Sequence, residues 1–492
     1  MATCTLSRLI TSKKVDNRSK YELFDAFLSD KGRLIYSAPF RRLQQKAQVF
    51  SLESNSAVRS RLSHSLEVAH IGAYISHAIT KKIKQNENKN EDMKFWIDNE
   101  ISINTVVETT CLMHDIGNPP FGHFGESTIS EWFQNDVRLS NIIAKAGLTN
   151  GKENICDCVK DKLSIKDFIL FDGNPQALRI ATKLQGEDGL TGLNFTFTQI
   201  AASLKYTHGG KNYSKNKSNH LTSKLGYFST EQEIVEKVWD ELGMPENGRH
   251  PLTFIMEAAD DISYCTSDID DGIENKVVTE KDFFEYITTH TPPSILKNQD
   301  IFDIVQICKG IRTNHKISAF TEFKTKLSSK LVEKAASIFS ENFCLIMQFG
   351  FHSPLLKEDL ESEDILFLLC LVKKFTREHI FNNSDVELIE LSGHSILTGL
   401  LNCYTPILEL KADEFLKLIN DEKSNASKVA ARLSRTLPKK CVKSYKEQLE
   451  IKKHEKFTEW NLRAHLIIDF ISGMTDQYAL ELYQSLAGIK VK

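Results

Sequence analysis

The amino-acid sequence predicts a mainly α-helical protein, with one large helical core that carries insertions and continues into a C-terminal helical extension. Apolar residues recur at helical spacing in most of the long segments. Few segments show the alternation of apolar and polar residues that is typical of half-buried strands. Polar stretches that contain Gly and Pro separate the helical segments. At most small β-hairpins are therefore expected.

The expected helices follow from these patterns in order along the chain. In the segment 61–83, Leu62 and Leu66 lie near helical spacing, and the polar run QNENKNED ends the pattern. Further helices are expected at residues 101–115, 126–133, 174–184, 230–242, 252–273, 367–381 and 461–488. We interpret the polar stretch 207–220 as a mobile, basic excursion and 420–427 as a joint between helices.

The composition is typical of a soluble globular protein, with 41% hydrophobic and 26% charged residues. A chain of 492 residues is expected to form two to four domains or one elaborated domain. The formal net charge of −3 argues against wholesale nucleic-acid binding. The longest apolar run, Ile365–Val372, is too short to span a bilayer. The ten cysteines are scattered without a CxxC pair, and the N-terminus lacks the apolar core of a signal peptide, so we expect a cytoplasmic location.

The segment HDIGNPPFGHFGE, residues 114–126, concentrates side chains that bind metals around a turn broken by Gly and Pro. It begins with His114 and Asp115. His64 lies on an otherwise half-buried helix, and Asp260 follows the apolar run LTFIM, where a carboxylate is costly unless it is paired or coordinated. Two imidazoles and two carboxylates suit a divalent ion such as Mn²⁺, Mg²⁺, Fe²⁺ or Zn²⁺. Such a set leaves coordination positions for water and a phosphate oxygen, as metal-assisted hydrolysis requires.

These residues also carry a family resemblance. The ordered set His64, His114-Asp115 and Asp260 resembles the H…HD…D signature of the HD-domain metal-dependent phosphohydrolases. The segments RSRLSHSLEVAH, LMHDIGNPPFGHFGE, MEAADDISY and DFISGMTDQYA resemble the deoxyguanosine triphosphate triphosphohydrolases, or dGTPases. RRLQQKAQVF, LKY and KLGYFSTEQE are similar to that family too, so the resemblance extends from about residue 30 to 485. It implies a helical HD-domain core.

The resemblance implies hydrolysis of a deoxynucleoside triphosphate, dGTP above all, to the deoxynucleoside and tripolyphosphate. Water attacks the α-phosphorus, and the 5′ oxygen of the sugar leaves. The implied metal ligands are His64, His114, Asp115 and Asp260. The implied cofactor is Mg²⁺ or Mn²⁺, with Fe²⁺ and Zn²⁺ as alternatives.

The family assigns a His–Glu pair to catalysis, which falls here on His123 and Glu126. His123 lies eight positions beyond Asp115, past the proline turn, so the chain can fold it back towards the metal. Glu126 could orient one ring nitrogen and stabilise an imidazolium. The spacing leaves open whether His123 is base, acid or nucleophile. The alternative is that Glu126 is a helix-start carboxylate and His123 caps a loop.

The remaining expected site residues bind the substrate. Asp260, Tyr264 and Asp268 recur at i, i+4 and i+8, which places them on one helix face. The family places the tyrosine against the deoxyribose, where it would crowd a 2′-hydroxyl, and the second aspartate nearby. The other positions that match the family's phosphate and sugar contacts are Gln48, Arg61, Asn174, Lys205 and Lys224.

The resemblance also implies assembly and a division of the chain. We expect residues 1–60 to contribute to the substrate pocket and to oligomer contacts, 61–275 to form the metal core with a phosphate-binding insertion, and 276–492 to complete the pocket and the oligomer. Relatives form hexamers, and some bind single-stranded DNA, for which the basic run 438–456 is a candidate contact. A charged, solvated helix face is the alternative for that run. No membrane partner is expected.

The sequence departs from the family near 420–427, where relatives can insert an arginine of a neighbouring subunit into the base pocket. This chain offers only Lys423 there, so a preference for deoxynucleotides broader than dGTP stays open. Two other functions are alternatives: another HD-domain nucleotide phosphohydrolase, such as a nucleotidase or alarmone hydrolase, and a nucleotide-sensing or DNA-binding regulator with a degenerate site. His123, Glu126 and Tyr264 argue against the first, and the intact ligand set against the second.

Overall fold

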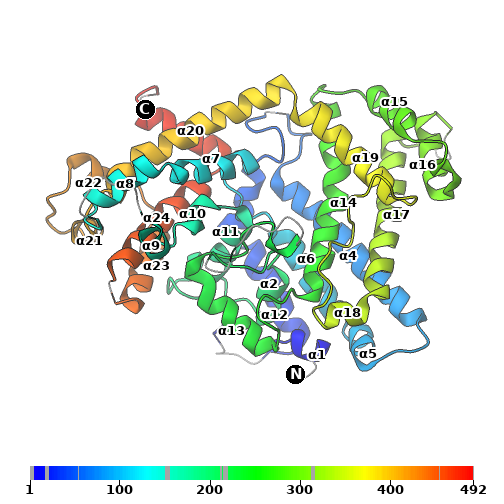
Figure 1. The fold of residues 1–492 in the computed structure, drawn as a ribbon, viewed down its shortest axis with the longest axis horizontal. Coiled ribbons are helices and arrows are strands. Elements are labelled where there is room, and N and C mark those ends of the chain that lie inside the picture. Colours follow the sequence, from blue (N-terminus) through cyan, green and yellow to red (C-terminus); the bar gives the residue numbers. More distant parts are fainter. Residues whose placement is uncertain are drawn as a thin grey trace.

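The structure is a computed structural model that describes residues 5–16, 21–53, 55–149, 156–210, 213, 220–311, 316–453 and 455–490. Every regular element within these ranges is a helix (Figure 1). Pairing of extended segments is limited there to three isolated β-bridges. The prediction of a mainly α-helical protein is therefore confirmed.

The helices have the following bounds. The N-terminal part contains α1 (Leu6–Leu9), α2 (Leu23–Ile35), α3 (Ala38–Arg42), η1 (Leu43–Gln45), α4 (Arg61–Gln85), α5 (Glu91–Asp98), α6 (Glu100–Met113), α7 (Gly122–Gln134) and α8 (Asp136–Lys145). The middle part contains α9 (Asp157–Lys162), α10 (Lys166–Ile169), α11 (Gly173–Arg179), η2 (Ile180–Leu184), α12 (Phe197–Ala202), η3 (His220–Thr222), η4 (Ser229–Glu231), α13 (Gln232–Leu242), α14 (Pro251–Glu274), α15 (Glu280–His290), η5 (Ile295–Lys297), α16 (Gln299–Cys308), α17 (Ala319–Glu341) and α18 (Phe343–Met347). The C-terminal part contains α19 (Leu366–Thr376), η6 (Arg377–Phe381), α20 (Ser384–Leu408), α21 (Ala412–Ile419), α22 (Lys428–Ser434), α23 (Lys439–Ile451), α24 (Lys456–Ser472) and α25 (Asp476–Leu486).

Helices α4, α6, α14 and α17 pack together as the central bundle (Figure 1). A capping box starts α4: the Ser60 hydroxyl accepts from the Ser63 backbone N–H, and the Ser63 hydroxyl accepts from the Ser60 N–H. Pro251 opens α14 at a position where its missing N–H leaves no bond unmade. Helix α14 is buried along most of its length, and several of its polar residues are buried with it. His64 and Asp260 are thereby carried on neighbouring helices of one rigid bundle.

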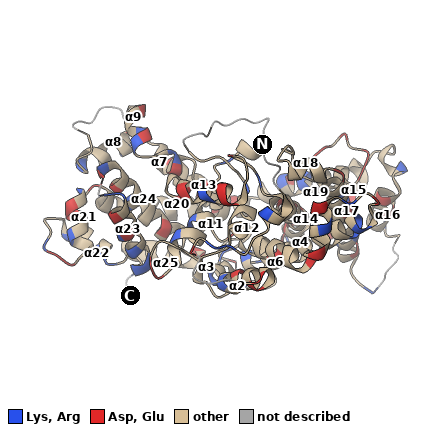
Figure 2. Cartoon of the chain, turned by 90° about the horizontal axis from the view of Figure 1, so that it is seen from below, with Lys and Arg blue, Asp and Glu red and all other residues tan. Residues whose placement is uncertain are grey.

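The buried apolar side chains form two clusters. The first lies within the central bundle and includes the N-terminal helices and α12 to α19. The second is built from α7, α8, α10, α20 and the C-terminal helices up to α25. Helix α20 joins the two, because Val386 near its start belongs to the first cluster and Ile396 and later residues belong to the second. Figure 2 shows Lys and Arg interspersed with Asp and Glu over most elements.

The segment expected as one helix at 461–488 forms two helices, α24 and α25, with residues 473–475 between them. The other expected helices are present, with local differences. Two of them end in a π-helical turn, at Ile180–Leu184 and at Arg377–Phe381. Helix α7 begins at Gly122, four residues before the expected start, because Phe121 (φ 63°) and Gly122 (φ 57°) turn the chain with left-handed backbone. The joint at 420–427 is confirmed as the loop between α21 and α22, whereas most of the 207–220 stretch lies outside the described residues. In the described part of the chain, no helix is long and apolar enough to cross a bilayer.

Candidate active site

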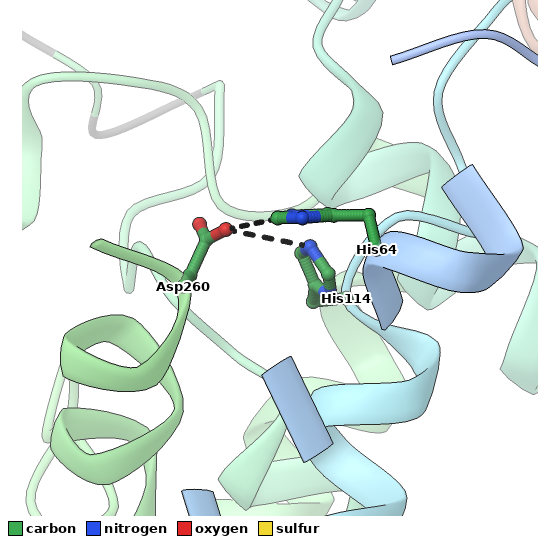
Figure 3. Close-up of side chains that lie close together, drawn as sticks. All are labelled: His64, His114 and Asp260. Carbon is green, nitrogen blue, oxygen red and sulfur yellow. Dashed lines mark hydrogen bonds and ion pairs between the residues drawn. The ribbon is translucent and has the colours of Figure 1, made fainter. Parts of the chain in front are cut away.

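Three helices bring a cluster of nitrogen and oxygen donors together. His64 extends from α4, His114 caps the C-terminus of α6, and Asp260 extends from α14 (Figure 3). Oδ1 of Asp260 lies 3.4 Å from Nε2 of His64 and 3.5 Å from Nε2 of His114. The three donor atoms lie within 4.8 Å of one another, so a single ion can reach all of them.

Asp115 lies beside this three-residue cluster. Its Oδ1 lies 3.5 Å from Nε2 of His114 and accepts a 2.6 Å hydrogen bond from Nδ2 of Asn118. Its Oδ2 accepts a 2.7 Å bond from the Arg61 guanidinium. Burial alone would raise the pKa values of Asp115 and Asp260, but the charge of Arg61 holds the first below its usual range and that of Lys205 the second. Both carboxylates are therefore ionised.

The His114 ring is oriented for metal binding by its own helix. Nδ1 lies 2.6 Å from the carbonyl oxygen of Cys111, one turn earlier, so Nδ1 carries the proton and donates. The lone pair of Nε2 then faces the carboxylates. That atom is buried and has no hydrogen-bond partner among the described residues, an arrangement that costs free energy unless a ligand fills the place. Two neutral imidazole nitrogens and two carboxylates fit a divalent ion.

His123 and Glu126 lie in the first two turns of α7. Nδ1 of His123 lies 2.9 Å from Oε2 of Glu126, and Oε1 of Glu126 accepts a 2.7 Å bond from the Gly173 backbone N–H. A side chain at Gly173 would collide with Oδ1 of Asn118, so only glycine lets this N–H approach. The Glu126 hydrogen bond and charge raise the pKa of His123. The Glu126 carboxylate is buried, whereas the His123 side chain is 71% exposed and faces the cavity.

One cavity of about 350 Å³ connects the donor cluster with the His123–Glu126 pair. All of the predicted site residues except Asp268 line it: Gln48, Arg61, His64, His114, Asp115, His123, Glu126, Asn174, Lys205, Lys224, Asp260 and Tyr264. Asp268 is fully buried beyond Tyr264, and burial raises its pKa to about 7. Eight residues of an α-helix advance about 12 Å and leave the side chain about 80° off the starting face, which explains why Asp268 does not line the cavity with Asp260.

The cations of the cavity are held by carboxylates. Nζ of Lys205 lies 3.3 Å from Oδ2 of Asp260. Nζ of Lys224 lies 2.5 Å from Oδ2 of Asp172, whose Oδ1 accepts a 2.6 Å bond from the Asn174 amide. Both lysines line the cavity, so a phosphate that enters it meets positive charge beside Asp260, from Lys205, and beside Glu126, from Lys224.

A second wall of the cavity was not predicted from the sequence. Lys373, Arg377 and Phe381 follow at intervals of four residues from α19 into the π-helical turn. Nζ of Lys373 lies 2.7 Å from Oδ1 of Asp261, and Glu358 forms ion pairs with both Lys373 and Arg377 at 3.3 Å. The four-residue spacing was visible in the sequence, but it gave no sign of which helix this face would meet. Asn118, Tyr206, Met256, Cys265 and Thr376 also line the cavity.

The basic run 438–456 forms α23 and its flanks. Its tyrosine, Tyr445, is buried and donates a 2.6 Å bond to Glu459, so its ring is not available to stack on a base. Lys440 and Lys452 pair with Glu187 and Glu233. Lys423 is exposed in the loop before α22 and does not line the cavity.

Comparisons with known proteins agree with this site. The family model of the HD domain matches residues 61–167, and that of the phosphohydrolase-associated domain matches residues 405–485. The HD match and the donor cluster identify a site for a divalent metal ion.

Relatives match over almost the whole length. The deoxyguanosinetriphosphate triphosphohydrolase of Yersinia enterocolitica is 35% identical over 95% of this chain and 94% of its own. The proteins of that name from Serratia proteamaculans and Enterobacter sp. are 35% and 34% identical, over 96% of both chains. The chain therefore belongs to the deoxyguanosinetriphosphate triphosphohydrolase family of HD-domain proteins.

Proposed function

We propose that the protein hydrolyses dGTP, and related deoxynucleoside triphosphates, to the deoxynucleoside and tripolyphosphate. The observation that supports this proposal most directly is that the donor cluster and the His123–Glu126 pair line the same cavity, beside cationic side chains. Family membership supports the reaction, because the relatives bear the name of this activity.

His64, His114, Asp115 and Asp260 are the proposed ligands of a Mg²⁺ or Mn²⁺ ion. Their mixture of imidazole nitrogen and carboxylate oxygen, without a thiolate, suits these ions. When bound, the ion supplies Lewis acidity to the phosphoryl group and to the attacking water. Arg61 and Asn118 hold the Asp115 carboxylate, and the Cys111 carbonyl orients the His114 ring.

His123 is the proposed general acid for the departing 5′ oxygen. The bond from Nδ1 to Glu126 leaves Nε2 as the ring atom that can face substrate, and the raised pKa favours the imidazolium. An alkoxide is a poor leaving group, so a proton delivered at this oxygen lowers the barrier. Glu126 orients the ring and stabilises its charge.

The other cavity residues are proposed to select and hold the substrate. Arg61, Lys205 and Lys224 bind the phosphates together with Asn174, and Gln48 borders the phosphates and sugar. Tyr264, one turn beyond Asp260, forms the wall against which the deoxyribose lies, so a 2′-hydroxyl is excluded by shape. Asp268 supports that wall from behind.

We infer the division of labour that the sequence predicts. The cavity of the 61–275 core is also lined by Gln48, from residues 1–60, and by Lys373 and Arg377, from residues 276–492. This shared lining supports the division of the chain. We also propose that the protein forms a homo-oligomer, a hexamer as in relatives. Contact with single-stranded DNA is a second part of this proposal. The burial of Tyr445 favours a solvated charged face at 438–456. Size-exclusion chromatography with light scattering tests the oligomeric state. A salt titration of DNA binding tests the contact with single-stranded DNA.

The deciding experiment separates reaction products. The protein is incubated with each deoxynucleotide and ribonucleotide plus Mg²⁺ or Mn²⁺, and products are resolved by ion-exchange chromatography. Deoxyguanosine and tripolyphosphate support the proposal. Monophosphate plus diphosphate, or release of single phosphates, would instead indicate another HD-domain phosphohydrolase, and binding without turnover would indicate a nucleotide-sensing regulator. The relative rates of the four deoxynucleotides measure how narrow the base preference is.

A further inference from the structure

The turn between the metal ligands and the His123–Glu126 pair is held by residues from both ends of the chain. Residues 117–121 leave α6 and enter α7. The N-terminal segment before α4 contacts this turn, and so does the junction of α24 and α25. Two buried titratable side chains, Lys46 and Asp476, make these contacts.

Lys46 joins the turn to the end of α24. Its side chain is 3% exposed, and Nζ donates to the backbone carbonyls of Asn118 and Ser472, the second at 2.8 Å. A buried ammonium is costly unless acceptors surround it, and both acceptors here are main-chain atoms. The bond to Asn118 acts on the residue whose amide also holds Asp115.

Asp476 joins the same turn to the strand-like segment that carries Lys46. Its Oδ1 accepts a 3.1 Å bond from the Phe121 N–H, and its Oδ2 accepts a 3.0 Å bond from the Ala47 N–H. The carboxylate is buried at the first position of α25. One side chain of the C-terminal region thus fixes two N-terminal backbone segments.

The backbone at Phe121 needs such support. A bulky residue with φ of 63° is in the left-handed region, which costs free energy and persists only where the surroundings impose it. This residue is the N-cap of α7, so its conformation sets the direction in which the helix, and His123 with it, leaves the turn.

We infer that Lys46 and Asp476 are positioning residues that lock the 117–121 turn and so hold His123 and Glu126 over the metal ligands. The C-terminal region thereby takes part in catalysis through Asp476 and the Ser472 carbonyl. This inference rests on the proposed function of the His123–Glu126 pair. His64, His114 and Asp260 are held by their own helices, so a loosened turn displaces the catalytic pair and leaves these three in place.

The test compares Lys46→Met and Asp476→Asn with Lys84→Met, a control at an exposed lysine at the far end of α4. Both test substitutions preserve side-chain volume. Steady-state rates are measured with dGTP at saturating Mn²⁺, so a change in metal affinity does not enter. We expect kcat to fall on the order of 10- to 100-fold, the scale of a small misplacement of a catalytic group, with KM changed by less than about threefold. Lys84→Met matches the wild type.

Hydrogen exchange gives a readout that does not depend on activity. In both variants the amides of Gly117, Asn118 and residues 121–124 are expected to exchange faster, while those of α6 and α14 keep their wild-type protection. Mn²⁺ binding followed by calorimetry stays measurable. Unchanged exchange in the turn would overturn the inference, whatever the kinetics show. If Lys46→Met does not fold, Asp476→Asn carries the test.

A double-mutant cycle with Glu126→Gln separates positioning from general destabilisation. If Lys46 acts through the His–Glu pair, Lys46→Met adds little to the loss already caused by Glu126→Gln. Multiplicative losses would overturn the inference. Wild-type turnover and its loss in His123→Ala test the proposed function separately. A failure of that function is therefore not mistaken for a failure of the positioning role of Lys46 and Asp476.

Discussion

His123 and Glu126, three residues apart on α7, form a 2.9 Å contact in which the histidine is exposed to the cavity and the glutamate is buried. The second oxygen of Glu126 is taken by the Gly173 N–H, so the carboxylate cannot rotate away. The ring is held by one nitrogen and presents the other towards the space beside the metal ligands. This arrangement suits a proton donor better than a metal ligand.

Removing the imidazole should separate catalysis from metal binding. In His123→Ala we expect kcat for dGTP to fall by on the order of 10²-fold or more, the usual contribution of a general acid. The affinity for Mn²⁺, measured by calorimetry, should stay at the wild-type value because the donor cluster is untouched. Normal turnover of His123→Ala would show that the catalytic assignment is wrong.

Glu126 should set the pH dependence of the reaction. Its hydrogen bond and charge raise the pKa of His123 above the ordinary value of 6.5, so the acid form persists to higher pH. As the pH rises through that pKa, the imidazolium is lost and kcat falls. In Glu126→Gln the pKa returns towards 6.5, so the descending limb of the kcat–pH profile moves to lower pH. A limb that stays in place or moves to higher pH contradicts this role.

Removal of a metal ligand should abolish metal binding and enzymatic activity together. In Asp115→Ala, the cluster loses one carboxylate and Arg61 loses its 2.7 Å partner. We expect neither Mn²⁺ binding in calorimetry nor product in the dGTP assay. Asp261→Asn is the matched control, since Asp261 lines the same cavity but pairs with Lys373 outside the cluster. Retained metal binding in Asp115→Ala would remove Asp115 from the ligand set.

The donor cluster could be predicted from the sequence because each ligand sits in a local pattern. His64 lies three residues after Arg61 on a periodic helix, and His114 and Asp115 lie where a helix meets a Gly- and Pro-rich break. Such features depend on neighbours in the chain. The mainly α-helical fold was predictable for the same reason.

The second wall of the cavity and the contacts of Lys46 and Asp476 with the 117–121 turn depend on tertiary packing. Whether the face with Lys373 and Arg377 meets α14 is decided by how α19 packs, and a π-helical turn shifts that face within the helix. In the sequence, nothing distinguishes Lys46 from an ordinary surface lysine. Its burial depends on contacts with residues distant in the chain, such as Ser472 of α24. Asp268 does not line the cavity with Asp260, because eight residues do not close whole helical turns.

Tyr264 should control discrimination against ribonucleotides. Tyr264→Ala removes the wall beside the sugar, so the ratio of kcat/KM for dGTP over GTP should fall about tenfold or more, while Tyr264→Phe keeps the ring and the ratio. Both ratios are measured at saturating Mn²⁺. An unchanged ratio in Tyr264→Ala would place the 2′ position elsewhere in the cavity.

Glu257 should stabilise the fold in a pH-dependent way. Its carboxylate is buried, accepts a 2.8 Å bond from Arg249 and lies 2.6 Å from Nε2 of His220. Burial alone would raise the pKa, but the charge of Arg249 and the bond to His220 lower it to about 2 from 4.5. A carboxyl with a lowered pKa contributes stability that is present above pH 4.5 and is lost as the pH falls towards 2.

Glu257→Gln should therefore lower the free energy of unfolding at pH 7 by on the order of 3 kcal/mol. The difference from the wild type, measured by urea titration, should hold down to about pH 5 and shrink below pH 4.5 as the wild-type carboxyl begins to lose its advantage. Glu233→Gln, at a 77% exposed side chain paired with Lys452, should cost less than about 1 kcal/mol at any pH. A Glu257→Gln difference that grows as the pH falls would mean that the pKa of this carboxyl is raised, not lowered, in the folded protein.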